Sequence, residues 1–314
     1  MDSGLDRTLV LPPTPTQSAA AGTQRFVLSG TDFLLVMSSL IWGINISVVK
    51  YGTTLVQPLA YNGVRVTLAA VALLLIAFSS READLTRRDV VTLLGLGVLG
   101  NGLYQLFFIQ GVASTRAGNA ALVLAATPAF VALIGRIVGV ERIGHRGVAG
   151  IALSIVGIAL VAFSSAGGDG SQSGTLAGDL MILAGTLCWS LFSVLLKPLA
   201  GRVGTLRVAA LTMTGGAIPL LLFSLPAILA TNWLAVPLVG WGAIVFSGLG
   251  ALVVAYLFWY RGVRLLGPTR TAMYGNLQPV IALAFAWLAL SEVPTIWQVL
   301  GATTIIAGIV LTRR

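Results

Sequence analysis

Long apolar segments separated by short polar connections constrain the fold of this chain more than any other feature. Each segment is long enough to cross the hydrocarbon core of a bilayer, which needs about 20 apolar residues in a helix. The ten segments span roughly residues 31–51, 58–79, 90–112, 117–138, 147–164, 177–198, 205–226, 237–260, 268–290 and 296–312. Lipid offers the backbone no hydrogen-bonding partner, so we predict an all-α integral membrane protein with ten transmembrane helices.

The composition agrees with a membrane protein and excludes several other classes. Charged residues make up 9% of the chain, whereas a soluble domain carries about 25%. The net charge is +9, but the basic residues lie between apolar segments and form no stripe with aromatics, so we expect no nucleic-acid partner. The chain has one cysteine, Cys188, and one histidine, His145. We therefore expect no metal site, no cofactor and no enzymatic centre.

The lysines and arginines predict the orientation of the chain in the membrane. With the N-terminus inside, about sixteen of them fall on the inner side, and Lys50, Arg65 and Arg116 fall on the other. Cytoplasmic loops carry this excess of positive charge, so both termini are predicted to be cytoplasmic in a multi-pass protein of the inner (plasma) membrane. Residues 1–30 are polar and rich in Thr, Ser, Ala and Pro, which predicts a disordered cytoplasmic tail.

The sequence also contains an internal repeat. Asp32, Trp42 and Lys50 recur 147 positions later as Asp179, Trp189 and Lys197. A second set recurs 151 positions later: Gly97, Phe107, Gly111, Pro128, Glu141, Gly150 and Gly157 match Gly248, Phe258, Gly262, Pro279, Glu292, Gly301 and Gly308. The two repeats, residues 31–164 and 177–312, each hold five segments. An odd number inverts the second half relative to the first, and inverted repeats are typical of transporters that work by alternating access.

The last two segments of each repeat carry motifs that identify a family resemblance. The first copy runs from Ala117-Gly118-Asn119-Ala120-Ala121 to Pro128, Glu141, Gly150 and Gly157, and the second from Thr271-Ala272 to Pro279, Glu292, Gly301 and Gly308; the first segment adds Trp42-Gly43-Ile44-Asn45. This arrangement resembles the EamA family of the drug/metabolite transporter superfamily. The resemblance implies a ten-helix inverted-repeat transporter, usually a bacterial inner-membrane exporter of amino acids, other metabolites or drugs.

Polar and aromatic residues within the segments are candidates for a substrate site, because polar groups in a membrane usually face the protein interior. Ser38, Trp42 and Asn45 share one helix face, as do Asn101, Tyr104 and Gln105. The candidate substrate-binding residues are Trp42, Asn45, Asn101, Tyr104, Gln105, Trp189, Tyr256 and Asn276. The alternatives are helix packing for the tryptophans and interhelical hydrogen bonds for the amides.

Several other residues have expected roles in movement or structure. Pro128 and Pro279 lie within predicted helices and are candidate hinges, with a purely structural kink as the alternative. Glu141 and Glu292 are expected to form structural or gating ion pairs near the membrane boundary. Lys50 is expected to extend towards the interface. No acidic residue falls in the middle of a segment, so uniport, exchange and coupling through a boundary acid all stay open.

These observations predict a secondary transporter that exports a small metabolite, either amino-acid-like or another polar or amphipathic solute. The expected partners are this solute and the lipid bilayer, with a homodimer left open. The largely uncharged, aromatic candidate site favours neutral, zwitterionic or amphipathic solutes. The main alternative is a flippase for a lipid or lipid-linked substrate. An integral-membrane enzyme and a non-transporting assembly subunit are the remaining alternatives.

Overall fold

The computed structural model describes residues 30–78, 85–139, 144–166, 175–266, 271, 274, 275 and 277–312. Every regular element in this part of the chain is helical, which confirms the all-α prediction. In chain order the elements are α1 (Gly30–Leu55), α2 (Pro58–Phe78), α3 (Arg87–Gly97), η1 (Val98–Leu103), α4 (Tyr104–Ser114), α5 (Ala117–Ala125), α6 (Thr127–Ile137), α7 (His145–Ala166), α8 (Leu176–Ala200), α9 (Thr205–Ala230), η2 (Trp233–Ala235), α10 (Leu238–Val245), η3 (Phe246–Val254), α11 (Ala255–Leu266), α13 (Leu277–Leu290) and α14 (Ile296–Thr312).

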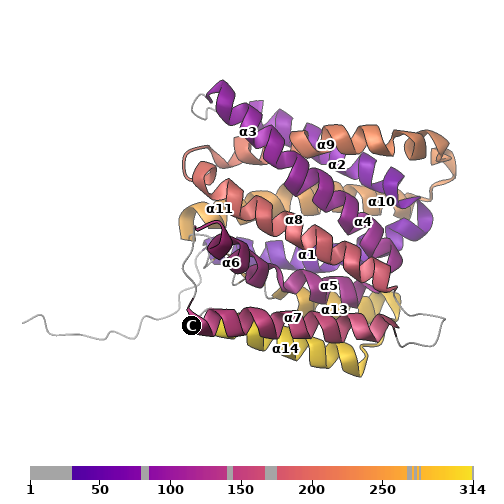
Figure 1. Ribbon diagram of the computed structural model, residues 1–314. Coiled ribbons are helices and arrows are strands. Elements are labelled where there is room, and N and C mark those ends of the chain that lie inside the picture. Colours follow the sequence, from indigo (N-terminus) through magenta and orange to yellow (C-terminus); the bar gives the residue numbers. More distant parts are fainter. Residues whose placement is uncertain are drawn as a thin grey trace, which may run out of the picture.

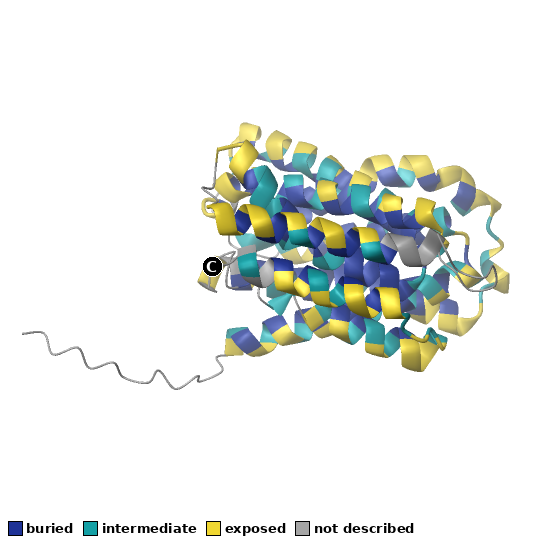
Figure 2. Cartoon of the chain, turned by 60° about the horizontal axis from the view of Figure 1, so that its bottom comes forward, coloured by how far each residue is buried: buried dark blue, intermediate teal, exposed yellow. Residues whose placement is uncertain are grey.

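The helices have the length and the surface of membrane spans. Within the described residues, seven are long and apolar enough to cross a membrane: Gly30–Leu55, Pro58–Phe78, Arg87–Ser114, Ala117–Ile137, Leu176–Leu199, Thr205–Ala230 and Leu238–Gly262. Three shorter apolar helices coincide with the remaining predicted segments: His145–Val161, Leu277–Leu290 and Ile296–Gly308. Exposed residues cover the outer faces of the bundle (Figure 2), and many are large and apolar, such as Phe78, Leu229 and Leu288. An apolar exterior is the surface that a bilayer requires.

The helices lie side by side in a layered bundle. In Figure 1, α2, α3 and α9 lie along one edge, and α7 and α14 lie together along the other. Between these edges α1 packs on α11 and α13, while α8 packs on α4 and α6. Helix α2 also packs on η3, and α9 packs on η1. The interior is therefore lined by α1, α2, α4, α8 and α11.

Glycines allow α7 and α14 to approach closely. A Cβ added to Gly157 would lie 2.9 Å from the carbonyl oxygen of Gly301, and one added to Gly301 would lie 2.9 Å from that of Gly157. The two glycines come from different repeats and face each other, and their repeat equivalents, Gly308 and Gly150, also lie against each other. Without side chains between them, the two backbones pack directly, as is common where membrane helices associate through small residues.

Two helices are widened by π-helical segments, which the sequence pattern did not predict. Segment η1 joins α3 to α4, and η3 joins α10 to α11. At their ends the N–H of Tyr104 bonds the carbonyl of Leu99, and that of Ala255 bonds the carbonyl of Gly250, a spacing of five residues. The repeat offset of 151 carries η1 onto the second part of η3. Such bulges are often found at functional sites.

The two predicted hinge prolines have different positions. Pro128 lies in the first turn of α6, two residues after Ala126, where the fourth predicted span breaks into α5 and α6. Pro279 lies in the first turn of α13, where its missing N–H interrupts no hydrogen bond of the described helix. Only Pro128 therefore marks an interruption between two described helices. Glu141 lies outside the described residues.

Candidate functional site

Four of the predicted site residues form a continuous aromatic cluster, although they come from four helices. Trp42 of α1 contacts Tyr256 of α11 with ring centroids 5.7 Å apart. Tyr256 in turn contacts Trp189 of α8 at 5.7 Å, and Trp189 contacts Tyr104 of α4 at 5.2 Å. We call Trp42, Tyr104, Trp189 and Tyr256 the aromatic cluster. It joins the first half of the chain to the second at the centre of the bundle.

Hydrogen bonds fix the α1 side of the cluster. The indole Nε1 of Trp42 donates to the carbonyl oxygen of Ala251 in η3 at 2.9 Å, and the hydroxyl of Ser38 donates to that of Ala255 at 2.9 Å. The predicted helix face of Ser38 and Trp42 therefore packs against the π-helical turn. Wide turns of this kind make backbone carbonyls available to side chains. Trp42 is only partly buried, so its ring keeps an accessible surface.

Next to the aromatic cluster lies a fully buried arginine, Arg65 of α2. Its Nε donates to Oδ1 of Asn62 at 2.9 Å, and its Nη2 donates to Oε1 of Gln105 at 2.6 Å. The Asn62 amide also donates to the backbone carbonyl of Gln105 at 2.9 Å. Gln105, a predicted site residue, thus receives the guanidinium group and ties α2 to α4.

The surroundings of Arg65 are aromatic. Its guanidinium carbon lies 6.0 Å from the ring centre of Tyr61 and 5.5 Å from that of Phe108, within the range of cation–π interactions. The ring of Phe108 in turn contacts that of Tyr104 in the aromatic cluster, with ring centroids 5.7 Å apart. The cluster and the guanidinium group therefore form one continuous site.

Arg65 was expected only as an orientation signal near the outer end of its segment, and its burial beside the aromatic cluster was not predicted. Arg65 is 0% exposed and lies about 10 Å along α2 from its first residue. A cation inside a membrane helix is by default a functional residue. That signal was present in the sequence, since Arg65 follows Asn62 within an otherwise apolar run.

Two of the remaining predicted amides, Asn101 and Asn45, are buried and have side-chain atoms without hydrogen-bond partners in the described residues. Asn101 lies in η1, is fully buried, and neither atom of its amide has a hydrogen-bond partner in the described residues. Asn45 is buried, and its Oδ1 has no partner there either. Asn276 lies outside the described residues. Buried amides without partners are rare in proteins, and each calls for an explanation.

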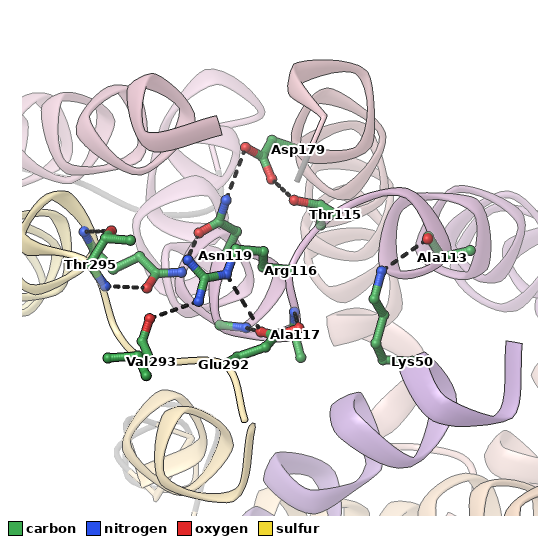
Figure 3. A network of polar contacts seen from close by, with 12 residues as sticks. Lys50, Ala113, Thr115, Arg116, Ala117, Asn119, Asp179, Glu292, Val293 and Thr295 are labelled. Atoms are coloured by element: carbon green, nitrogen blue, oxygen red, sulfur yellow. Dashed lines mark hydrogen bonds and ion pairs between the residues drawn. The ribbon is translucent and has the colours of Figure 1, made fainter. Parts of the chain in front are cut away.

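A separate group of polar contacts lies at one end of the bundle (Figure 3). Glu292 accepts hydrogen bonds from the backbone N–H groups of Ala117, at 3.2 Å, and Gly118, at 3.4 Å. Its carboxylate also lies 4.0 Å from Nε of Arg116, whose Nη2 donates to the carbonyl of Val293 at 2.7 Å. Glu292 therefore both caps the N-terminus of α5 and forms an ion pair there.

The same end of the bundle is joined by buried amides and carboxylates. Asp179 of α8 accepts from the hydroxyl of Thr115 at 2.5 Å and from the amide of Asn119 at 3.5 Å. Asn119 also accepts from Nε2 of Gln298 in α14 at 2.6 Å. Lys50 donates to the carbonyl of Ala113 at 3.0 Å, so its ammonium group binds the end of α4. We call the residues of these two paragraphs the end network.

The described residues contain no group of three or more His, Cys, Asp or Glu side chains arranged to hold a metal ion. The chemistry that the site offers is therefore that of rings, amides and one guanidinium group. Such groups bind a small molecule reversibly.

Comparisons with known proteins agree with this architecture. The model of the EamA-like transporter family matches residues 29–163 and again residues 176–314. The chain is 27% identical over 278 residues to the uncharacterized transporter YyaM of Bacillus subtilis (strain 168), covering 88% of this chain and 91% of the relative. A protein of known crystal structure has the same fold, with a TM-score of 0.62 and 23% identity over 91% of this chain and 99% of its own.

Two further relatives carry more specific names. One is a probable amino-acid metabolite efflux pump of Salmonella typhimurium, 28% identical over 88% of this chain and 92% of the relative. The other is a probable terminal-alkyne amino-acid exporter of Streptantibioticus cattleyicolor, 27% identical over 91% of this chain and 94% of the relative. These findings confirm the resemblance seen in the sequence and indicate a multi-pass membrane transporter, not an enzyme. The chain belongs to the EamA-like transporter family.

Proposed function

We propose that the protein is a secondary transporter that exports a small amino-acid-like or other polar or amphipathic metabolite by alternating access. The observation that carries the proposal is the aromatic cluster with its adjoining buried polar groups, built from both halves of the chain at the centre of an apolar bundle. Such groups are costly in a membrane protein unless they face a solute pathway. The names of the amino-acid exporters among the relatives support the same class of solute.

The mechanism follows from ten helices arranged as two inverted repeats of five. Two separate matches to one family model support two related halves. The helix contacts support the exchange of equivalent elements: α1 packs on α11 and α13 as α8 packs on α4 and α6, and α2 packs on η3 as α9 packs on η1. If each half adopts the conformation of the other, the site becomes accessible from the opposite side of the membrane.

The end network would close one side of this pathway. It ties α5 to α8 and α14 and to the connection before α14, through Asp179, Gln298 and Glu292. The excess of positive charge on the other side supports an outer-face position for this end, with both termini cytoplasmic in the inner (plasma) membrane. Pro128, at the break between α5 and α6, is the proposed hinge of this closure, and Pro279 is its proposed counterpart.

Transport by purified protein in proteoliposomes tests the proposal. Vesicles loaded with a panel of labelled amino acids and related metabolites are expected to lose at least one solute only when they contain the protein. Trp189→Ala should reduce this flux strongly, because it removes the central contact of the aromatic cluster. Trp287→Ala is the matched control, since Trp287 is 57% exposed on the outer surface. Absence of any solute flux, or movement of labelled lipid in its place, would contradict the proposal.

A further inference from the structure

The guanidinium group of Arg65 is a buried positive charge for which the described protein supplies no negative charge. Each described acid is engaged elsewhere: Asp32 with Tyr274, Asp89 with Arg202, Asp179 with Thr115, and Glu292 with Arg116. A buried ion without a partner is strongly unfavourable, and buried charges in proteins are normally paired. The described residues therefore leave the positive charge of Arg65 uncompensated.

The hydrogen bonds of Arg65 are also incomplete. A guanidinium group has five N–H donors. Nε donates to Asn62 and Nη2 donates to Gln105, whereas Nη1 is buried and has no hydrogen-bond partner in the described residues. The neighbouring Nη1 and Nη2 atoms form the edge that matches the two oxygens of a carboxylate. A bound carboxylate would both accept hydrogen bonds from the free donors and supply the missing negative charge.

The neighbourhood of Arg65 defines the rest of the ligand. The ring of Phe108 lies 5.5 Å from the guanidinium carbon and contacts Tyr104 of the aromatic cluster. Aromatic faces bind apolar groups, and they also attract an ammonium group. A small molecule with a carboxylate at one end and an apolar or ammonium-bearing part at the other fits both halves of the site.

We propose that Arg65 binds the carboxylate of the transported solute, while the aromatic cluster binds its remaining part. The inference rests on the proposed function and narrows it to carboxylic acids, of which α-amino acids are the simplest class that carries both groups. Arg65 would then discriminate between a carboxylate and a neutral group of the same size. The bonds to Asn62 and Gln105 hold the guanidinium group in position for that task.

The first experiment uses wild-type protein and ligand chemistry alone. The probes are the twenty common L-amino acids and, for every probe that raises the thermal unfolding midpoint, its primary amide and its decarboxylated amine. We expect the amide and the amine to bind about 10- to 100-fold more weakly than the acid, because the charged hydrogen bonds to Arg65 are lost. Equal binding of acid and amide would overturn the inference.

Variants then assign the discrimination to Arg65. Arg65→Gln should bind the acid no better than the amide. Arg65→Lys keeps the positive charge but not the planar pair of donors, so it should recover only part of the preference for the acid over the amide. Arg264→Gln removes an exposed arginine and should behave as wild type. A role of Arg65 limited to joining α2 and α4 would lower affinity for acid and amide alike. If Arg65→Gln does not fold, the wild-type comparison of acid, amide and amine decides alone.

The outcome for the inference can be separated from that for the proposed function. If no amino acid binds but proteoliposomes transport neutral or cationic solutes, the transporter stands and the carboxylate site is overturned. If no solute moves, the proposed function fails and the inference fails with it. Flux of an acid without flux of its amide supports both.

Discussion

Glu292 offers a direct test of how the end network is stabilised. Its carboxylate caps the first turn of α5 through Ala117 and Gly118 and pairs with Arg116 at 4.0 Å. We predict that Glu292→Gln weakens this end of the bundle moderately and that Glu292→Ala weakens it more. The reason is that glutamine keeps one acceptor oxygen but no charge, whereas alanine keeps neither.

The magnitude follows from the contacts. The two hydrogen bonds, 3.2 and 3.4 Å long, contribute about 0.5–1 kcal/mol each. The ion pair and the interaction with the helix dipole together add about 0.5–1 kcal/mol, because both partners are partly exposed. Glu292→Ala should therefore cost about 1.5–3 kcal/mol of unfolding free energy, and Glu292→Gln about 1–2 kcal/mol.

Hydrogen exchange measured by mass spectrometry locates the effect. Since about 1.4 kcal/mol corresponds to a tenfold change in an equilibrium constant, Glu292→Gln should accelerate exchange in peptides over residues 117–120 by about 5- to 30-fold. Asp89→Asn is the matched control, because Asp89 forms the capping box of α3 with Thr86. That change should accelerate exchange at the start of α3 and leave residues 117–120 unchanged. Unaltered exchange at residues 117–120 in Glu292→Ala would refute the capping role.

Three further predictions concern the bundle and the site. Gly157→Leu should lower the unfolding midpoint by an amount equivalent to about 1–3 kcal/mol, because α7 and α14 must separate. Gly95→Leu is the control and should not lower it, since a Cβ added to Gly95 would meet no neighbouring atom within 4 Å. Equal midpoints for the two variants would contradict the close packing. Trp42→Phe loses one hydrogen bond to η3 and should reduce transport in proteoliposomes, while Trp287→Phe should have no effect. An equal loss of transport in both variants would refute a specific role for Trp42 in the site. Asn101→Leu replaces an amide that has no hydrogen-bond partner among the described residues. It should leave stability unchanged or raise it by about 1–3 kcal/mol while reducing transport, and unchanged flux would remove Asn101 from the site.

Helical periodicity made much of the fold and part of the site predictable. Apolar runs of bilayer length located the helices, and the spacing of Ser38 and Trp42 placed them on one face. The repeat then paired Trp42 with Trp189, and the structure brings both rings onto Tyr256. These inferences succeeded because they depend on regular helix geometry and on the cost of polar groups in lipid.

Features that depend on contacts between helices were not predictable in the same way. Residues 98–103 are apolar and glycine-rich, a composition that fits an α-helix as well as the π-helix that forms. The burial of Arg65 was missed because the charge rule assigns loop arginines to a side and says nothing about what surrounds an arginine within a span. The contact of Lys50 with Ala113 requires α1 and α4 to be adjacent, which no local pattern encodes.

The π-helical segment η1 has a consequence for how its helix tolerates insertions and deletions. Each residue advances an α-helix by about 100°, so the wide turn changes the rotational register of everything that follows it. Deleting one residue from η1 would rotate α4 by about that angle and carry Tyr104 and Gln105 away from α8 and α2. Their alignment with Trp189 and Arg65 is thus set by the length of a glycine-containing turn, and a single-residue deletion there would dismantle the site while leaving the helix able to span the membrane.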